Sequence, residues 1–253
     1  MIYDIQKASA LKRLSALILD FILLLILATG AAYASSLIFN IDSHQANLQE
    51  KYKYYEETYN VSFDLKQEDF DNMSEEERAH YDEVEQIINH DEEFIKENQL
   101  VINLTFVIIL IGVLFGILIV EFVIPIIFKN GQTIGKKVFS LIVIKNNSVK
   151  VTNFQMFVRT IFGKFIIELI VPIYFIIMTM YGIVGYIGPI IVIALLILQV
   201  VLLIFTKYGT PIHDILAFTC VADKESQMIF ENEDELAHYK GKLHAESVAK
   251  DKY

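Results

Sequence analysis

Four long apolar runs constrain the fold of this chain more than any other feature of its sequence. A helix needs about 20 apolar residues to cross the hydrocarbon core of a bilayer, and each run reaches that length. The runs cover residues 14–39, 101–128, 162–181 and 187–205. Together with a hydrophobic content of 54%, they predict an all-α polytopic membrane protein with about four transmembrane helices.

The first run also has features of a signal peptide, because Ala32, Tyr33 and Ala34 precede Ser35 in the manner of a cleavage site. However, it is longer than the apolar core of most signal peptides, and it contains Asp20. We therefore expect a membrane anchor and keep cleavage as the alternative. The residues that follow would lie outside the membrane in either case.

Basic residues gather beside the ends of the apolar runs, and their distribution predicts the topology. Lys and Arg residues in short loops are retained in the cytoplasm. The residues concerned are Lys7, Lys12, Arg13, Lys129, Lys136, Lys137, Lys145, Lys150, Arg159, Lys164 and Lys207. We therefore expect both termini to be cytoplasmic and residues 42–99 to be extracytoplasmic. The predicted localisation is the plasma membrane of a bacterium, as a multi-pass protein.

This topology divides the chain into four segments. Residues 1–41 hold the N-terminus and the first transmembrane helix, and residues 42–99 form an acidic helical insertion. Residues 100–222 hold the rest of the membrane part together with a small cytoplasmic sheet. Residues 223–253 form a cytoplasmic tail, which is polar and mixed in charge, so we expect a surface helix or a disordered segment.

The insertion carries most of the acidic charge, since residues 42–98 contain 18 Asp or Glu residues against 5 Lys or Arg residues. Apolar residues recur at helical spacing around Tyr55 and around Val84, and Ser74 begins a capping box. These patterns predict an extracytoplasmic helical hairpin. Its acidic surface could attract a cation or a cationic protein partner, or it could simply be solvated.

A short cytoplasmic β-hairpin is predicted after the second run. Residues 140–145 and 148–152 are β-branched or apolar, and they flank Asn146 and Asn147. Residues 218–222 have the same character and could supply a third strand.

Ionisable side chains within the apolar runs are the most informative residues, because an intramembrane charge costs about 2.5–3.5 kcal/mol. The transport and ion-network candidates are Arg13, Asp20, Glu121, Arg159, Glu168, His213 and Asp214, and Lys164 can reach toward them. They could line a route for protons or small cations. They could equally form a buried ion-pair network that fixes the register of the helices. The sequence leaves both interpretations open.

Several functional classes lack support in the sequence. There is no basic patch interleaved with aromatic residues, so we expect no nucleic-acid partner. The single Cys220 excludes an internal disulfide, and no Cys/His spacing indicates a metal site. We expect no cofactor, and we expect no enzymatic activity, because no nucleophile and base are suitably arranged.

Several segments of the membrane part occur in a characteristic order. They are ALKRLSA at residues 10–16 leading to Asp20, GQTIGKK at 131–137 with LIV at 141–143, then Arg159, His213-Asp214 and CVA at 220–222. In order and spacing they resemble the RDD family of membrane proteins, named for one arginine and two aspartates. By this resemblance, Arg13 and Asp20 are the family's arginine and first aspartate, and Asp214 is the candidate for its second. The acidic insertion departs from the short loop of the family.

The resemblance implies a multi-pass membrane fold more firmly than it implies an activity. Transport, including sodium/proton exchange, has been proposed for some members of the family. We therefore predict a small ion or proton-coupled transporter. The alternative is a non-transporting accessory or scaffold protein that recruits a partner through the acidic outer hairpin.

Residues 131–137 also resemble a phosphate-binding loop, but they are one residue short and lack its Ser or Thr. We interpret them as an amphipathic inner-surface segment in which Lys136 and Lys137 contact anionic membrane lipid. Gly112 and Gly116 permit close helix approach, either within one chain or in a homo-oligomer.

Overall fold

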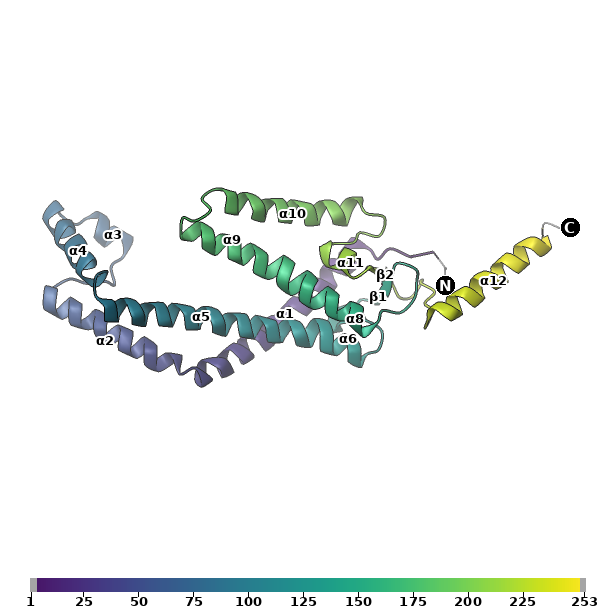
Figure 1. Ribbon diagram of the computed structural model, residues 1–253, viewed down its shortest axis with the longest axis horizontal. Coiled ribbons are helices and arrows are strands. Elements are labelled where there is room, and N and C mark those ends of the chain that lie inside the picture. The colour runs from purple at the N-terminus through teal and green to yellow at the C-terminus, as the bar shows by residue number, and fades with distance from the viewer. Residues whose placement is uncertain (1–3, 251–253) are drawn as a thin grey trace. The chain divides into compact units, whose positions relative to one another are not determined.

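A computed structural model describes residues 4–250 and is built mostly of helices (Figure 1). Four helices among the described residues are long and apolar enough to cross a membrane, which confirms the predicted spans. The first span is α1 (Ala10–Ile38), and the fourth is α10 (Ile187–Phe205). The second consists of α5 (Glu92–Leu118), η1 (Ile119–Val123) and α6 (Ile124–Ile127). The third consists of α8 (Asn153–Phe157), η2 (Val158–Ile170) and α9 (Val171–Met180).

The segments η1 and η2 are π-helical, and both are followed by a proline. Proline has no N–H group, so Pro125 and Pro172 cannot donate the backbone hydrogen bond that another residue would give at these positions. The hydroxyl of Thr160 donates to the Glu121 carbonyl at 3.0 Å. Because π-helical segments occur frequently at functional sites, their position next to the charged residues of both spans is informative.

The chain separates into two compact units. One unit comprises Leu27–Val113, and the other comprises Met1–Ile26 together with Leu114–Tyr253, of which residues 4–26 and 114–250 are described. Both α1 and α5 contribute residues to each unit.

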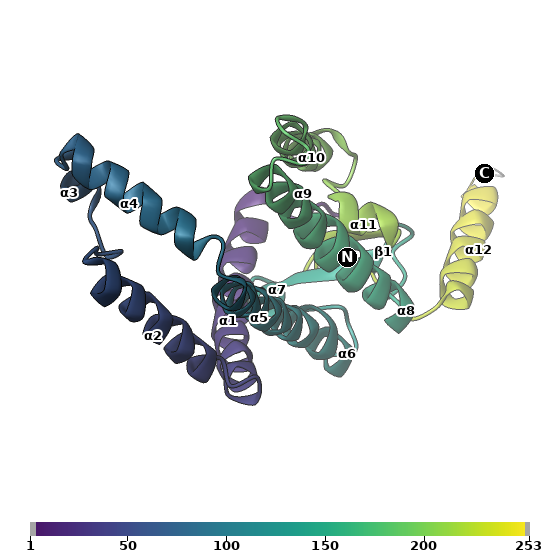
Figure 2. The same cartoon turned by 60° about the vertical axis from the view of Figure 1, so that its left-hand side comes forward.

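The unit Leu27–Val113 holds the acidic insertion. It contains α2 (Ile41–Tyr59), α3 (Gln67–Asp71) and α4 (Glu75–Ile88). The predicted capping box begins α4, where the Ser74 hydroxyl accepts a backbone hydrogen bond from the first turn. Helices α2 and α4 run alongside each other (Figure 2). Their side chains meet in one apolar cluster, which includes Tyr55 and Val84. The predicted helices are therefore present, and their extracytoplasmic location stays a prediction.

Asp91 joins α2 to the start of α5. Its Oδ1 accepts hydrogen bonds from the backbone N–H groups of Glu93 and Phe94 at 2.8 and 3.2 Å, and its Oδ2 accepts the Tyr55 hydroxyl at 2.5 Å. One carboxylate thus caps the second membrane span and satisfies a buried hydroxyl.

Replacing Asp91 with alanine is expected to lower the thermal unfolding midpoint by a few degrees, because the helix cap and the partner of Tyr55 are lost together. Far-ultraviolet circular dichroism of the purified protein measures this midpoint. The control is Asp82→Ala, which removes an exposed carboxylate from α4. Equal midpoints for the two variants would contradict the assigned role of Asp91.

In the other unit, the small sheet consists of two antiparallel strands, β1 (Leu141–Lys145) and β2 (Thr219–Asp223). The expected third strand is thus the partner of β1, with Val143 opposite Val221. Residues 148–152 make only isolated bridges, one of which joins Lys150 to Ile144. The small sheet is confirmed, but its pairing differs from the predicted hairpin.

The reason for this difference is the packing of Val149. It is buried in a cluster with Phe230 and Leu236, and it forms a parallel bridge with Phe230. The chain therefore leaves β1 after a single bridge. The same cluster holds the start of α12 (Glu233–Lys250), which is the helical alternative predicted for the tail.

Candidate functional site

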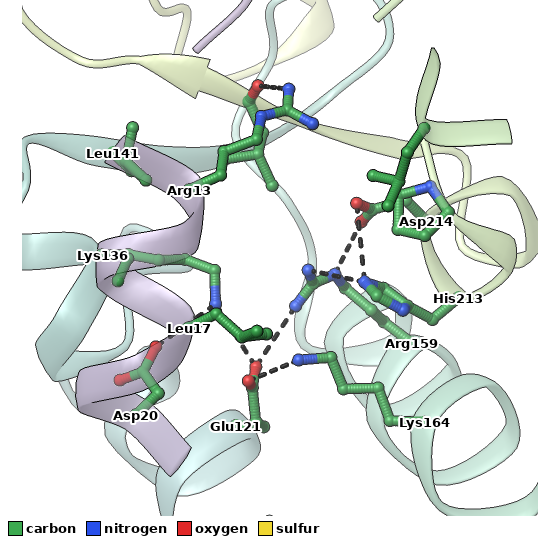
Figure 3. Close-up of a pocket in the computed structure, with 14 residues that line it drawn as sticks. Arg13, Leu17, Asp20, Glu121, Lys136, Leu141, Arg159, Lys164, His213 and Asp214 are labelled. Carbon is green, nitrogen blue, oxygen red and sulfur yellow. Dashed lines mark hydrogen bonds and ion pairs between the residues drawn. The ribbon is translucent and has the colours of Figure 1, made fainter. Parts of the chain in front are cut away.

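Eight ionisable residues of the unit formed by residues 4–26 and 114–250 line one pocket, with a volume of about 120 Å³ (Figure 3). Two short helices, α7 (Ile134–Val138) and α11 (Ile212–Leu216), complete its wall. Its ionisable lining residues are Arg13 and Asp20 of α1, Glu121 of η1, Lys136 of α7, Arg159 and Lys164 of η2, and His213 and Asp214 of α11. The pocket has room for several water molecules.

Asp20 is held by the start of α7. Its carboxylate accepts hydrogen bonds from the Thr133 hydroxyl at 2.5 Å and from the Gly135 backbone N–H at 2.8 Å. A Cβ atom on Gly135 would lie closer to the Ala16 carbonyl than real contacts allow, and 2.9 Å from the Asp20 carboxyl carbon. Glycine is therefore required here for the close approach of α7 to α1.

Lys136 points into the pocket, which corrects the prediction that it contacts lipid. The residue is only 8% exposed. Its Nζ lies 3.9 Å from Asp20 Oδ2, 3.4 Å from Glu121 Oε2 and 3.3 Å from Thr133 Oγ1. The contact of Gly135 with α1 orients α7 so that the next side chain faces these oxygens. Burial, opposed by the Glu121 carboxylate, lowers the pKa of Lys136 to about 8.

Lys137 is exposed, as the predicted contact with anionic lipid requires. Its ammonium lies 4.0 Å from the centre of the Phe128 ring, in cation–π geometry. Its contact with lipid stays a prediction.

Glu121 is the most heavily paired carboxylate of the pocket. It accepts a hydrogen bond from Lys164 and lies 3.4 Å from both Lys136 Nζ and Arg159 Nη1. Three cations from two elements therefore converge on one carboxylate, which is 6% exposed. Such a group is costly to bury unless it is paired in this way.

Arg159 connects Glu121 to Asp214. Its Nε donates to Asp214 Oδ1 at 2.7 Å, and the Thr219 hydroxyl donates to the same oxygen at 2.8 Å. Although burial opposes the charged form, the Arg159 guanidinium holds the pKa of Asp214 well below its usual range. Asp214 Oδ2 is buried, and among the described residues it has no hydrogen-bond partner.

His213 lies between Glu168 and Arg159. Its Nδ1 is 2.8 Å from Glu168 Oε1, and its Nε2 is 3.2 Å from Arg159 Nη2. An ionised carboxylate can only accept, so in the neutral imidazole Nδ1 carries the hydrogen and Nε2 accepts from Arg159. The backbone of Gly163 packs directly on His213, where a side chain would collide with it.

The start of α11 is capped by side chains from the third and fourth spans. Gln199 Oε1 accepts from the Ile212 N–H at 3.2 Å, and Glu168 Oε1 accepts from the His213 N–H at 3.2 Å. These bonds satisfy N–H groups that a helix start leaves free.

Arg13 and Asp20 are separated by two turns of α1, which is too far for a direct ion pair, and they do not form one. The Arg13 guanidinium donates instead to the carbonyls of Gly209, Tyr208 and Val221, at 2.6, 2.8 and 2.6 Å. It therefore ties α1 to the loop before α11 and to β2.

The site as a whole is close to electrical neutrality. Four carboxylates, those of Asp20, Glu121, Glu168 and Asp214, face four cations, those of Arg13, Lys136, Arg159 and Lys164. Among residues 4–250, no three His, Cys, Asp or Glu residues are grouped so that they could hold a metal ion.

The structure brings together all seven ion-network candidates, and it adds four residues that were not expected there. Thr133 and Gly135 bind Asp20, and Lys136 lies between Asp20 and Glu121. Lys164, which was expected to reach toward the network, binds Glu121. Gln199 caps α11. A signal for Gln199 was present, because its amide is the only polar side chain in α10. Gly135 lies in the segment 131–137 that carries the family resemblance, but the sequence did not indicate its contact with α1.

Comparison with known proteins gives one result. The model of the RDD family matches residues 7–218, a range that includes every residue of the pocket except Val221. No curated protein and no solved structure matches the chain significantly.

Proposed function

The chain belongs to the RDD family of membrane proteins, and we propose that it is a small multi-pass transporter that moves protons or small cations. The proposed route passes through the pocket around Asp20 and Glu121. We propose no enzymatic activity for it. The family and the four apolar helices support membrane insertion, and the pocket supports the more specific proposal.

The observation that carries the proposal is the sharing of Lys136 by two carboxylates. Its ammonium lies within 3.9 Å of both Asp20 and Glu121, beside a cavity that can hold water. Intramembrane carboxylates next to such a cavity are typical of ion and proton pathways. The pKa of Lys136, lowered to about 8, allows it to gain or lose a proton near neutral pH. Loss of that proton would leave Asp20 and Glu121 more attractive to an incoming cation.

The proposed orientation follows the distribution of basic residues. Both termini would be cytoplasmic and residues 42–99 extracytoplasmic, in a bacterial plasma membrane, because Lys and Arg gather at the opposite ends of the spans. Lys137 would then lie at the cytoplasmic surface, where it would contact anionic lipid.

In proteoliposomes, we expect sodium or potassium gradients to drive proton movement through the wild-type protein. Asp20→Asn is expected to reduce this flux at least about tenfold, since it removes one of the two charges that share Lys136. An entrapped pH indicator measures the flux. The control is Asp82→Asn, an isosteric change at an exposed site in α4, which is expected to transport normally. Absence of flux with wild-type protein would end the transport proposal.

A second candidate is an accessory or scaffold protein that recruits a cationic partner through the acidic insertion. Residues 42–98 contain 18 acidic residues and only 5 basic residues, and this negative charge favours an accessory role with a cationic partner. It predicts that a partner co-purifies with the full chain and is lost when residues 47–97 are deleted. Flux without such a partner would exclude it.

A further inference from the structure

The unpartnered oxygen of Asp214 faces the imidazole of His213. Asp214 Oδ2 lies 3.6 Å from His213 Nε2, just beyond hydrogen-bond distance. Asp214 is buried, and the His213 side chain is only 12% exposed. Meanwhile Nε2 already lies 3.2 Å from a donor, Arg159 Nη2. One nitrogen therefore has a donor on one side and an unused acceptor on another.

Arg159 Nη2 and Asp214 Oδ2 can bond to Nε2 in two different protonation states of the imidazole. In the neutral ring, Nε2 is an acceptor and uses the N–H of Arg159. In the protonated ring, Nε2 is a donor, so it would oppose the Arg159 N–H and would be drawn to Asp214 Oδ2. A shift of less than about 1 Å would bring that pair to the distance of a charge-assisted hydrogen bond. Glu168 accepts from Nδ1 in both states.

We propose that His213 is a second proton-binding site of the network beside Lys136, and that its protonation switches Nε2 from Arg159 to Asp214. This inference rests on the proposed transport and names a further residue at which a coupled proton binds. Every charged group that faces His213 takes part. Glu168, Arg159 and Lys164 face it from η2, and Asp214 faces it from α11.

The switch can reach the other end of the pocket through Arg159. When Arg159 Nη2 loses its acceptor, the same guanidinium still has Glu121 Oε2 at 3.4 Å from Nη1. A closer approach of Arg159 to Glu121 would compete with Lys136, which lies at the same distance from that oxygen. Protonation of His213 therefore weakens the attraction of Glu121 for Lys136 or for any other cation. The competition between Arg159 and another cation for Glu121 would thus couple proton binding at His213 to cation release.

Burial, with Asp214 opposing it and Arg159 adding to it, lowers the pKa of His213 below its ordinary value. Stability also depends on this shift, because the unfolded chain binds the proton more readily than the folded one. The protein therefore loses stability as the pH falls below about 6.5, and His213→Asn is expected to remove part of that loss.

The test is a pH titration of the protein with isotope-labelled histidine, in detergent micelles, by NMR spectroscopy. The six histidines give separate signals, and the signal missing from His213→Asn identifies His213. We expect its neutral ring to carry the hydrogen on Nδ1 and its titration midpoint to lie below the ordinary pKa of histidine. Asp214→Asn is expected to move this titration to still lower pH, and the control Asp82→Asn is expected to leave it unchanged.

A neutral ring that carries its hydrogen on Nε2 would overturn the proposal, because Nε2 could then not accept from Arg159 Nη2. So would a titration that Asp214→Asn leaves in place. If Asp214→Asn does not fold, the wild-type tautomer and the corresponding shift in Glu168→Gln decide the question. The NMR titration does not depend on flux. If His213 titrates as expected but the protein shows no flux, the transport proposal fails and the proposal for His213 stands.

Discussion

Arg159→Met is expected to destabilise the protein by about 3–5 kcal/mol, the largest effect of any single change considered for this chain. Arg159 is 1% exposed, and it pairs with Asp214 at 2.7 Å and with Glu121 at 3.4 Å. Methionine fills similar space but leaves both carboxylates with fewer counter-ions in a buried site. The cost arises from the stranded charges and only to a small extent from lost packing.

Thermal unfolding in detergent, followed by circular dichroism, measures this effect. Lys53→Met is the control, since Lys53 is exposed and its pairing with Glu57 contributes little. Adding Asp214→Asn to Arg159→Met is expected to recover part of the stability, because one stranded charge is removed. A double variant that loses the full sum of both single effects would show that the two residues do not form a pair.

Gly135→Ala is expected to be the second most damaging change, costing about 1–3 kcal/mol. The added Cβ would collide with the Ala16 carbonyl and would lie 2.9 Å from Asp20 Oδ1. Neither the backbone carbonyl nor a carboxylate held by two hydrogen bonds can yield without cost. Making room for the methyl group would separate α7 from Asp20, and transport would fall together with stability.

Gly30→Ala is the matched control, because Gly30 also lies in a described helix and has no atom within 4 Å of its added Cβ. There, alanine is expected to be neutral or slightly stabilising, since it favours helix over glycine. The melting temperatures of the two variants should therefore change in opposite directions. A Gly135→Ala protein as stable and as active as wild type would contradict the assigned contact between α7 and α1.

The spans could be predicted from the sequence because transmembrane helices depend on length and hydropathy, both of which are local properties. The charged residues could be selected for a similar reason, since the cost of burying Asp20 or Glu121 requires partners somewhere in the fold. The partners themselves could not be assigned. They depend on the orientation of short helices, and the turn of α7 that directs Lys136 inward is set by a contact of Gly135.

The prediction of the strand pairing was wrong for a related reason. Residues 148–152 have the composition of a strand and follow an Asn-Asn turn, and local pattern alone favours a hairpin. The outcome depends on Phe230, more than 75 residues later, which pairs with Val149. The π-helical segments were likewise not predicted, although Pro125 and Pro172 were visible near the ends of both.

The most direct test of the account is whether water and ions reach the pocket around Asp20 during transport. Leu17 lines this pocket, and Ile190 of α10 does not, although their exposed fractions are similar at 61% and 62%. Each can be replaced by cysteine, because the native Cys220 is buried and burial raises its pKa to about 12, which makes it unreactive. The reagent is a small, water-soluble thiol reagent that does not cross membranes.

We expect Leu17→Cys to react with this reagent and to lose flux in proteoliposomes on reaction, whereas Ile190→Cys stays unmodified and active. If Leu17→Cys remains unmodified while the protein transports, or if it is modified with no change in flux, the pocket is not the route.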